Sequence, residues 1–68
     1  MEQWANSRFR EIAEEYVHSE RDRLLIIRKY CDDRTFEQVA EEFDISVSQA
    51  KRIAYKQGQI VFRIMERN

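Results

Sequence analysis

Hydrogen-bonding side chains are concentrated between residues 46 and 56, in the run SVSQAKRIAYK. The guanidinium group of Arg52 can donate two hydrogen bonds to the edge of a guanine. Lys51 and Lys56 flank it, and their ammonium groups can bind phosphates as point charges. The other candidate phosphate ligands in the chain carry hydroxyl groups: Thr35, Ser46, Ser48 and Tyr55. This combination predicts contacts with both the bases and the backbone of a nucleic acid.

The charges of the chain are unevenly distributed, although the formal net charge is only −1. Residues 1–44 contain 7 Lys/Arg and 12 Asp/Glu, a charge of −5, whereas residues 45–68 contain 5 Lys/Arg and 1 Glu, a charge of +4. A basic surface on an acidic body is typical of a small DNA-binding domain. A solvated charged surface with no role in binding is an alternative explanation for this uneven distribution of charge.

Two short helices joined by a tight turn are predicted around this basic run. Phe36, Val39, Ala40 and Phe43 have the i, i+3, i+4, i+7 spacing of an apolar helix stripe. The same spacing recurs in the next segment, at Val47, Ala50, Ile53 and Ala54. We therefore expect helices at 36–43 and 47–57, separated by a turn at 44–46. This is the layout of a helix-turn-helix, whose second helix can lie in the major groove of DNA.

The ends of the two helices have matching signals. Thr35 precedes Gln38 by three residues, and Ser46 precedes Gln49 by three, so each pair can form a capping box. Asp44 occupies the turn position that favours a left-handed residue, which Asp adopts more readily than most. An ordinary helical hairpin without a nucleic-acid role has the same periodicity, and the capping boxes favour the helix-turn-helix.

Two further helices are expected before this motif. The first spans residues 4–17, with its apolar stripe opposite a charged face. The second spans residues 20–31, begins after Ser19, and faces the core through Leu24, Ile27, Tyr30 and Cys31, with Leu25 and Ile26 widening the apolar surface.

The last helix extends from Val47 to about residue 66. Gly58 lies within it and costs up to about 1 kcal/mol relative to Ala, so a kink or break there is an alternative. The predicted fold is therefore all-α, with four or five helices.

Length and composition set further limits. A chain of 68 residues with no Pro and one Gly fits a single all-helical domain, residues 1–68. A domain this small has limited stability of its own, so a partner subunit would help. Cys31 is the only cysteine, which excludes an internal disulfide. The chain has no apolar run long enough to span a membrane and no evident signal peptide, so we expect a cytoplasmic protein.

Signatures of catalysis and of cofactor binding are absent from the sequence. Gly58 alone cannot form a phosphate-binding loop. His18 and Cys31 are the only imidazole and thiol, and no third ligand is placed with them, so no zinc site is expected. Glu11 and Glu15 are spaced as neighbours on an exposed helix face. We expect a protein that is not an enzyme and binds no cofactor and no metal.

The region from Ser19 to about Met65 resembles region four, the C-terminal domain of bacterial sigma factors. The resemblance rests on SERDR, LLIIRKY, TFEQVAEEF and ISVSQAKRI. Asp44 replaces the usual turn Gly, and Ala50 is smaller than the usual apolar residue. The resemblance implies base contacts by Val47, Ser48 and Arg52, with Gln49 and Lys51 nearer the DNA backbone.

Two functions follow from these observations. The first is a small sigma-like transcriptional regulator, of phage or mobile-element type, that binds double-stranded DNA. The alternative is a protein-interaction module that binds RNA polymerase or another regulator through the acidic half. A full sigma factor is not expected, because the chain lacks room for the other sigma regions. A homodimer is a further hypothesis, with Trp4 and Phe62 as candidate contact residues; Trp4 fits the edge of the core as well.

Overall fold

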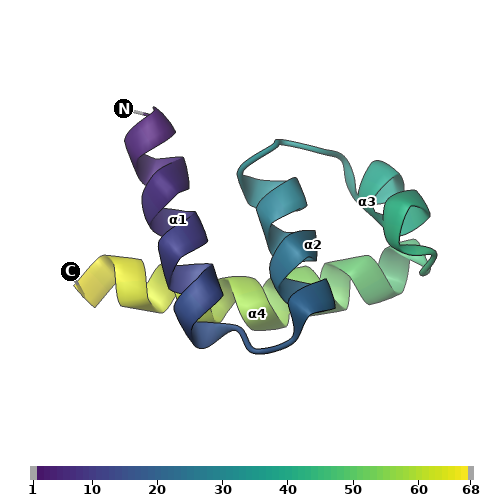
Figure 1. Ribbon diagram of the computed structural model, residues 1–68. Coiled ribbons are helices and arrows are strands. Elements are labelled where there is room, and N and C mark those ends of the chain that lie inside the picture. Colours follow the sequence, from purple (N-terminus) through teal and green to yellow (C-terminus); the bar gives the residue numbers. More distant parts are fainter. Residues whose placement is uncertain (1, 68) are drawn as a thin grey trace.

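The longest helix contacts each of the other three. A computed structural model describes residues 2–67 of the chain, with side chains described for residues 6–67. It contains α1 (Glu2–Tyr16), α2 (Glu20–Tyr30), α3 (Phe36–Phe43) and α4 (Val47–Arg67), with no strand among the described residues. In Figure 1, α1 and α2 lie side by side and run in opposite directions across α4, and α3 lies beside the first turns of α4. The predicted all-α fold is confirmed.

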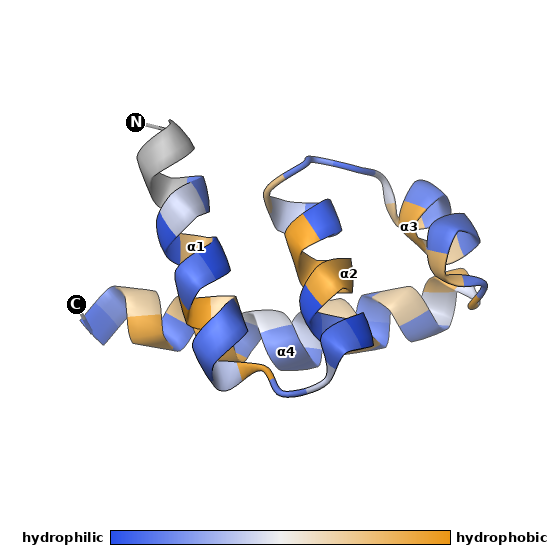
Figure 2. Cartoon of the chain, in the orientation of Figure 1, coloured by the Kyte–Doolittle hydropathy of each residue, from blue (hydrophilic) through white to orange (hydrophobic). Residues whose placement is uncertain are grey.

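The helix boundaries agree closely with the apolar spacing. Helices α3 and α4 begin at the predicted residues, while α1 and α2 each end one residue before the predicted position. The chain buries apolar residues from all four helices in one core: Phe9, Ile12, Ala13, Val17, Leu25, Ile26, Ile27, Val39, Ala40, Ala50, Ala54 and Val61. Figure 2 shows apolar residues alternating with polar ones along the helices. The side chain of Trp4 lies outside the described residues.

The buried face of α2 differs from the predicted one. Leu24 was expected in the core but is 39% exposed, whereas Leu25 and Ile26 are completely buried. Helix α2 packs against α1, α3 and α4 at once, so its core-facing surface is wider than a stripe and is rotated from the predicted one. Ile27 is buried as predicted.

Helix α4 continues through Gly58 without a break. A Cβ atom at this position would lie 3.0 Å from Cε2 of Tyr30 and 3.3 Å from its hydroxyl oxygen. Glycine is therefore favoured here by the close approach of the Tyr30 side chain of α2 rather than by a bend in α4. The four-helix alternative is confirmed.

The turn between α3 and α4 has the predicted left-handed residue. Asp44 has φ 57° and ψ 47°. The Ile45 N–H donates to the carbonyl of Ala40 at 3.0 Å, and the Asp44 N–H donates to that of Glu41 at 3.3 Å. These two bonds form a Schellman motif, which satisfies the last carbonyl groups of α3. The side chain of Ile45 packs against the core and closes the corner.

Capping boxes begin both helices of the motif. The Thr35 hydroxyl accepts from the Gln38 N–H at 3.1 Å, and the Gln38 side chain accepts from the Thr35 N–H at 3.0 Å. Ser46 and Gln49 form the equivalent pair, at 3.1 Å in both directions. Each box satisfies two backbone donors that have no partner within the helix, and together they define the start of α3 and of α4.

Ion pairs on the surface connect α1, α2 and α3. Arg28 contacts Glu42 of α3 at 3.0 Å and Asp32 at 3.2 Å, and Asp32 also contacts Arg10 of α1 at 3.3 Å. The hydrogen bond with Glu42 is the main reason that the pKa of Arg28 is raised, followed by the charge of Glu42 and the bond with Asp32. Because these groups are largely solvent-exposed, the pairs contribute little to the stability of the fold.

Candidate nucleic-acid interface

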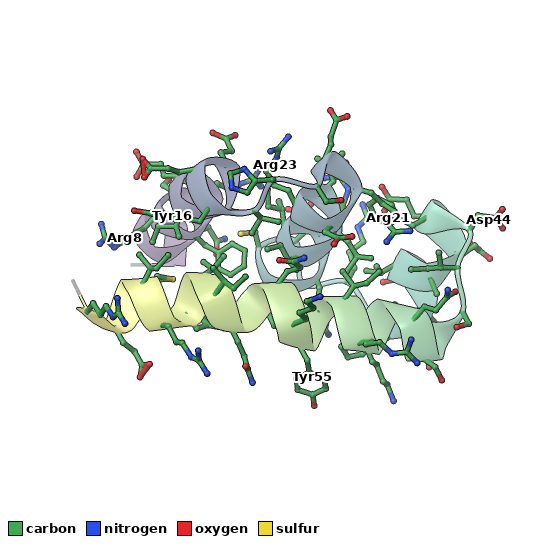
Figure 3. The ribbon with its side chains drawn as sticks, turned by 90° about the horizontal axis from the view of Figure 1, so that it is seen from below. Arg8, Tyr16, Arg21, Arg23, Asp44 and Tyr55 are labelled. Atoms are coloured by element: carbon green, nitrogen blue, oxygen red, sulfur yellow. The ribbon has the colours of Figure 1, made fainter. Side chains whose placement is uncertain are left out.

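One face of α4 points away from the rest of the molecule. Its exposed side chains include five of the predicted contact residues: Ser48, Lys51, Arg52, Tyr55 and Lys56. Tyr55 is 67% exposed, and Figure 3 shows it projecting from the side of α4 opposite to α1 and α2, along an edge with several nitrogen-tipped side chains. Five hydrogen-bonding side chains therefore share one open surface.

The opposite face of α4 fixes how the helix is rotated. Ala50, Ala54, Gly58 and Val61 are buried at i, i+4, i+8 and i+11. The Gln57 amide donates to Asp22 at 2.9 Å, and the Tyr30 hydroxyl donates to the Ala54 carbonyl at 3.5 Å. These contacts to α2 hold the exposed face of α4 in one orientation, as a docking surface requires.

The positive groups of this face are available for a ligand. Across the side chains of residues 6–67, the ion pairs involve Arg10, Arg21 and Arg28, and none involves a Lys or Arg of α4. Arg52 and Lys56 are exposed, and the Lys51 ammonium lies 5.9 Å from the centre of the Phe36 ring. A cation without a carboxylate partner binds phosphate without first breaking an internal ion pair.

The remaining predicted contact residues have structural roles as well. Thr35, Ser46 and Gln49 all belong to the capping boxes. Their acceptor oxygens are engaged, but the hydroxyl protons and the Gln49 NH₂ group remain available as donors. Val47 is half-buried against the core, which leaves less of it accessible for a base contact.

One cation near this surface was not predicted from the sequence. The ammonium of Lys29, on α2, lies 4.5 Å from the centre of the Phe36 ring, so Lys29 and Lys51 approach the same ring. Lys29 is remote from residues 46–56 in the sequence. Its position follows from the packing of α2 against α3, which the periodicity of the chain does not describe.

His, Cys, Asp and Glu side chains do not cluster among the described residues. No three His, Cys, Asp or Glu side chains in this part of the chain come together as metal ligands would. Burial raises the pKa of the Cys31 thiol, with the nearby Asp32 adding to the shift and Arg10 opposing it. Although α4 has 21 residues, none of the described helices has an apolar stretch that could cross a bilayer.

A family model for the homeodomain-like domain matches residues 17–60. The chain belongs to the homeodomain-like domain family. Its homeodomain-like domain comprises α2, α3 and α4 as far as Ile60, and α1 precedes it. The match supports a helix-turn-helix domain and is not specific to sigma region four. Searches of curated proteins and of solved structures found no match to the chain.

Proposed function

We propose that the protein is a sequence-specific DNA-binding regulator of transcription that places residues 47–57 of α4 in the major groove. The observation that carries this proposal is the exposed face of α4. Three cations there have no ion-pair partner among the side chains of residues 6–67, and they lie beside hydrogen-bonding side chains. Membership of the homeodomain-like family supports it, since helix-turn-helix domains place their second helix in that groove.

The proposed contacts divide into two groups. Arg52 lies one turn after Ser48, near the centre of the exposed face, and donates to the edge of a guanine. Lys51 and Lys56 lie about 140° apart around the helix axis, on either side of Arg52, and bind phosphates. This arrangement separates the residue that selects the sequence from those that hold the DNA, and it requires no catalysis.

Binding measurements on two duplexes test this division. A preferred site is first selected from a pool of random duplexes, and affinity is then measured by fluorescence anisotropy on that site and on random DNA. Arg52→Ala should weaken binding to the preferred site by about 1–3 kcal/mol and binding to random DNA by less. Lys56→Ala should weaken both alike and lower the salt slope by about 1.

Arg21→Ala is the matched control, since Figure 3 shows Arg21 and Tyr55 on opposite sides of α4. It should leave both affinities unchanged, and circular dichroism checks that every variant is folded. Equal losses for Arg52→Ala on both duplexes would assign Arg52 to the phosphates. Unchanged binding in both the Arg52 and Lys56 variants would remove α4 from the interface and favour the interaction module, with RNA polymerase or another regulator as the partner.

The proposal also includes binding of two copies of the protein to one DNA site. One recognition helix reads few base pairs, and helix-turn-helix dimers bind half-sites about one DNA turn apart. Exposed apolar side chains, including Tyr16 and Ile60, support a contact between copies. Phe62 is 42% exposed as well, although its ring also packs 5.5 Å from Phe9 and 5.1 Å from Tyr30. Sedimentation of the complex should give two chains per duplex, and one chain per duplex would contradict it.

The cellular setting completes the proposal. A sigma-like regulator of this size would act where transcription takes place, in the cytoplasm of a bacterial cell. A single half-buried cysteine without a disulfide suits the reducing conditions there.

A further inference from the structure

Two lysines from different helices meet at one aromatic ring. The Lys29 ammonium of α2 lies 4.5 Å from the centre of the Phe36 ring, and the Lys51 ammonium of α4 lies 5.9 Å from it. Lys29 also donates to the Arg34 carbonyl at 3.1 Å, which fixes its side chain beside the start of α3. We call Lys29, Phe36 and Lys51 the Phe36 cluster.

The two positive charges of the Phe36 cluster lie near one another. From their distances to the ring they are at most about 10 Å apart, which is one Debye length at 0.1 M salt. Among residues 6–67, neither lysine forms an ion pair, although Asp33 and Glu37 are near in the sequence. The ring attracts each ammonium by only about 0.5–1 kcal/mol at an exposed site. Both ammonium groups are therefore available to an anion bound at the cluster.

The cluster lies on one side of the proposed recognition face. Around the axis of α4, Ser48 and Arg52 lie between Lys51 on one side and Lys56 on the other. With this face in a major groove about 12 Å wide, the two sides of the helix face different DNA strands. Lys29 extends the Lys51 side of this face onto α2.

We propose that Lys29 and Lys51 together bind the backbone phosphates of one DNA strand beside the major groove. The inference rests on the proposed function and adds to it a second helix that contacts DNA. Since Lys29 belongs to α2 and Lys51 to α4, the two contacts fix the angle at which α4 enters the groove. Neither contact reads a base, so the cluster holds the protein in place without selecting the sequence.

Lys29→Gln tests the inference, with Arg34→Gln as the matched control. Both remove one positive charge from neighbouring positions, but Arg34 lines a separate surface hollow of about 490 Å³ with Glu41 and Glu42. Affinity is measured at several salt concentrations on the preferred and on the random duplex. Lys29→Gln should weaken binding equally on both and reduce the salt slope by about 0.9, while Arg34→Gln should change the slope by less. Lys29→Arg retains the charge and should restore binding.

Neutral phosphates locate the contact on the DNA. Methylphosphonate groups are placed one at a time along each strand of the preferred duplex. A methylphosphonate at the phosphate that the cluster binds should weaken DNA binding by the wild-type protein and have little effect on binding by Lys29→Gln. The phosphate bound by Lys56 is identified in the same way with Lys56→Ala, and the two phosphates should lie on opposite strands.

The outcomes separate this inference from the function on which it rests. If Arg52→Ala behaves as proposed but Lys29→Gln matches Arg34→Gln, the inference is wrong and the DNA-binding function stands. If every methylphosphonate weakens DNA binding by Lys29→Gln as much as binding by the wild type, the inference is also wrong. A wild-type protein that binds no duplex would overturn both.

Discussion

At the scale of single residues, the contact between Gly58 and Tyr30 determines how closely α2 and α4 approach. The Tyr30 ring is held on its other sides, 5.7 Å from the Phe9 ring and 5.1 Å from the Phe62 ring, and its hydroxyl donates to Ala54. It therefore has little freedom to move away from an added Cβ. Gly58, where the sequence left a kink or break as an alternative, lies in a continuous helix and allows two helices to pack closely.

Gly58→Ala should destabilise the protein by about 1 kcal/mol. Replacing a helical Gly gains up to about 1 kcal/mol, but the new methyl group would lie 3.0 Å from Tyr30, and overpacking typically costs about 1–3 kcal/mol. Urea denaturation measures the difference. In a Tyr30→Ala background the same substitution should become stabilising, because the obstructing ring is gone. A stabilising effect in the wild-type background would contradict the close contact.

The phenol of Tyr30 should make the protein less stable at high pH. Burial raises its pKa above the ordinary value of 10.0, and the charge of Tyr55 adds to the shift. The unfolded chain then loses this proton at lower pH than the folded chain does, so the contribution is constant below about pH 10 and decreases as the pH rises further. The free energy of unfolding, measured at pH 8 and above pH 10, should fall less in Tyr30→Phe than in the wild type. Tyr16→Phe, which removes an exposed phenol, is the control and should show the wild-type fall.

At the scale of the elements, local signals predicted the helix-turn-helix well. The spacing of Phe36, Val39, Ala40 and Phe43, with the capping residues Thr35 and Ser46, gave the observed ends of α3 and the observed start of α4. Caps and apolar stripes are interactions within a few residues, so they can be read directly from the sequence. The buried face of α2 was harder to predict, because Leu25 and Ile26 owe their burial to three neighbouring helices.

Asp44→Gly should stabilise the motif by about 1 kcal/mol. A left-handed conformation is unfavourable for a residue with a Cβ, and a carboxylate at the C-terminal end of α3 interacts poorly with the helix dipole. Asp44→Asn retains the tolerance for this conformation and removes the charge, so it should account for the dipole part, about 0.3–1 kcal/mol. Thermal unfolding of both variants measures these differences. A loss of stability in Asp44→Gly would mean that the Asp side chain has a favourable role that outweighs its conformation.

At the scale of the whole molecule, the candidate site was predictable where it lies on one helix. Ser48, Lys51, Arg52, Tyr55 and Lys56 share a face of α4, and a 100° periodicity is enough to group them. Lys29 approaches them only because α2 and α3 fold against one another, and no local pattern contains that information. Contacts between helices therefore could not be predicted from the sequence pattern.

The central position of α4 links DNA binding to the stability of the entire domain. Since α1, α2 and α3 each pack on α4, opening any of them exposes the helix that would meet the DNA. A ligand that binds only the folded chain lowers the population of every opened state in which its site is lost. Amide protons throughout α1, which lies before the family match and makes none of the proposed DNA contacts, would then exchange with solvent more slowly in the complex. The whole domain would in this way behave on DNA as one cooperative unit.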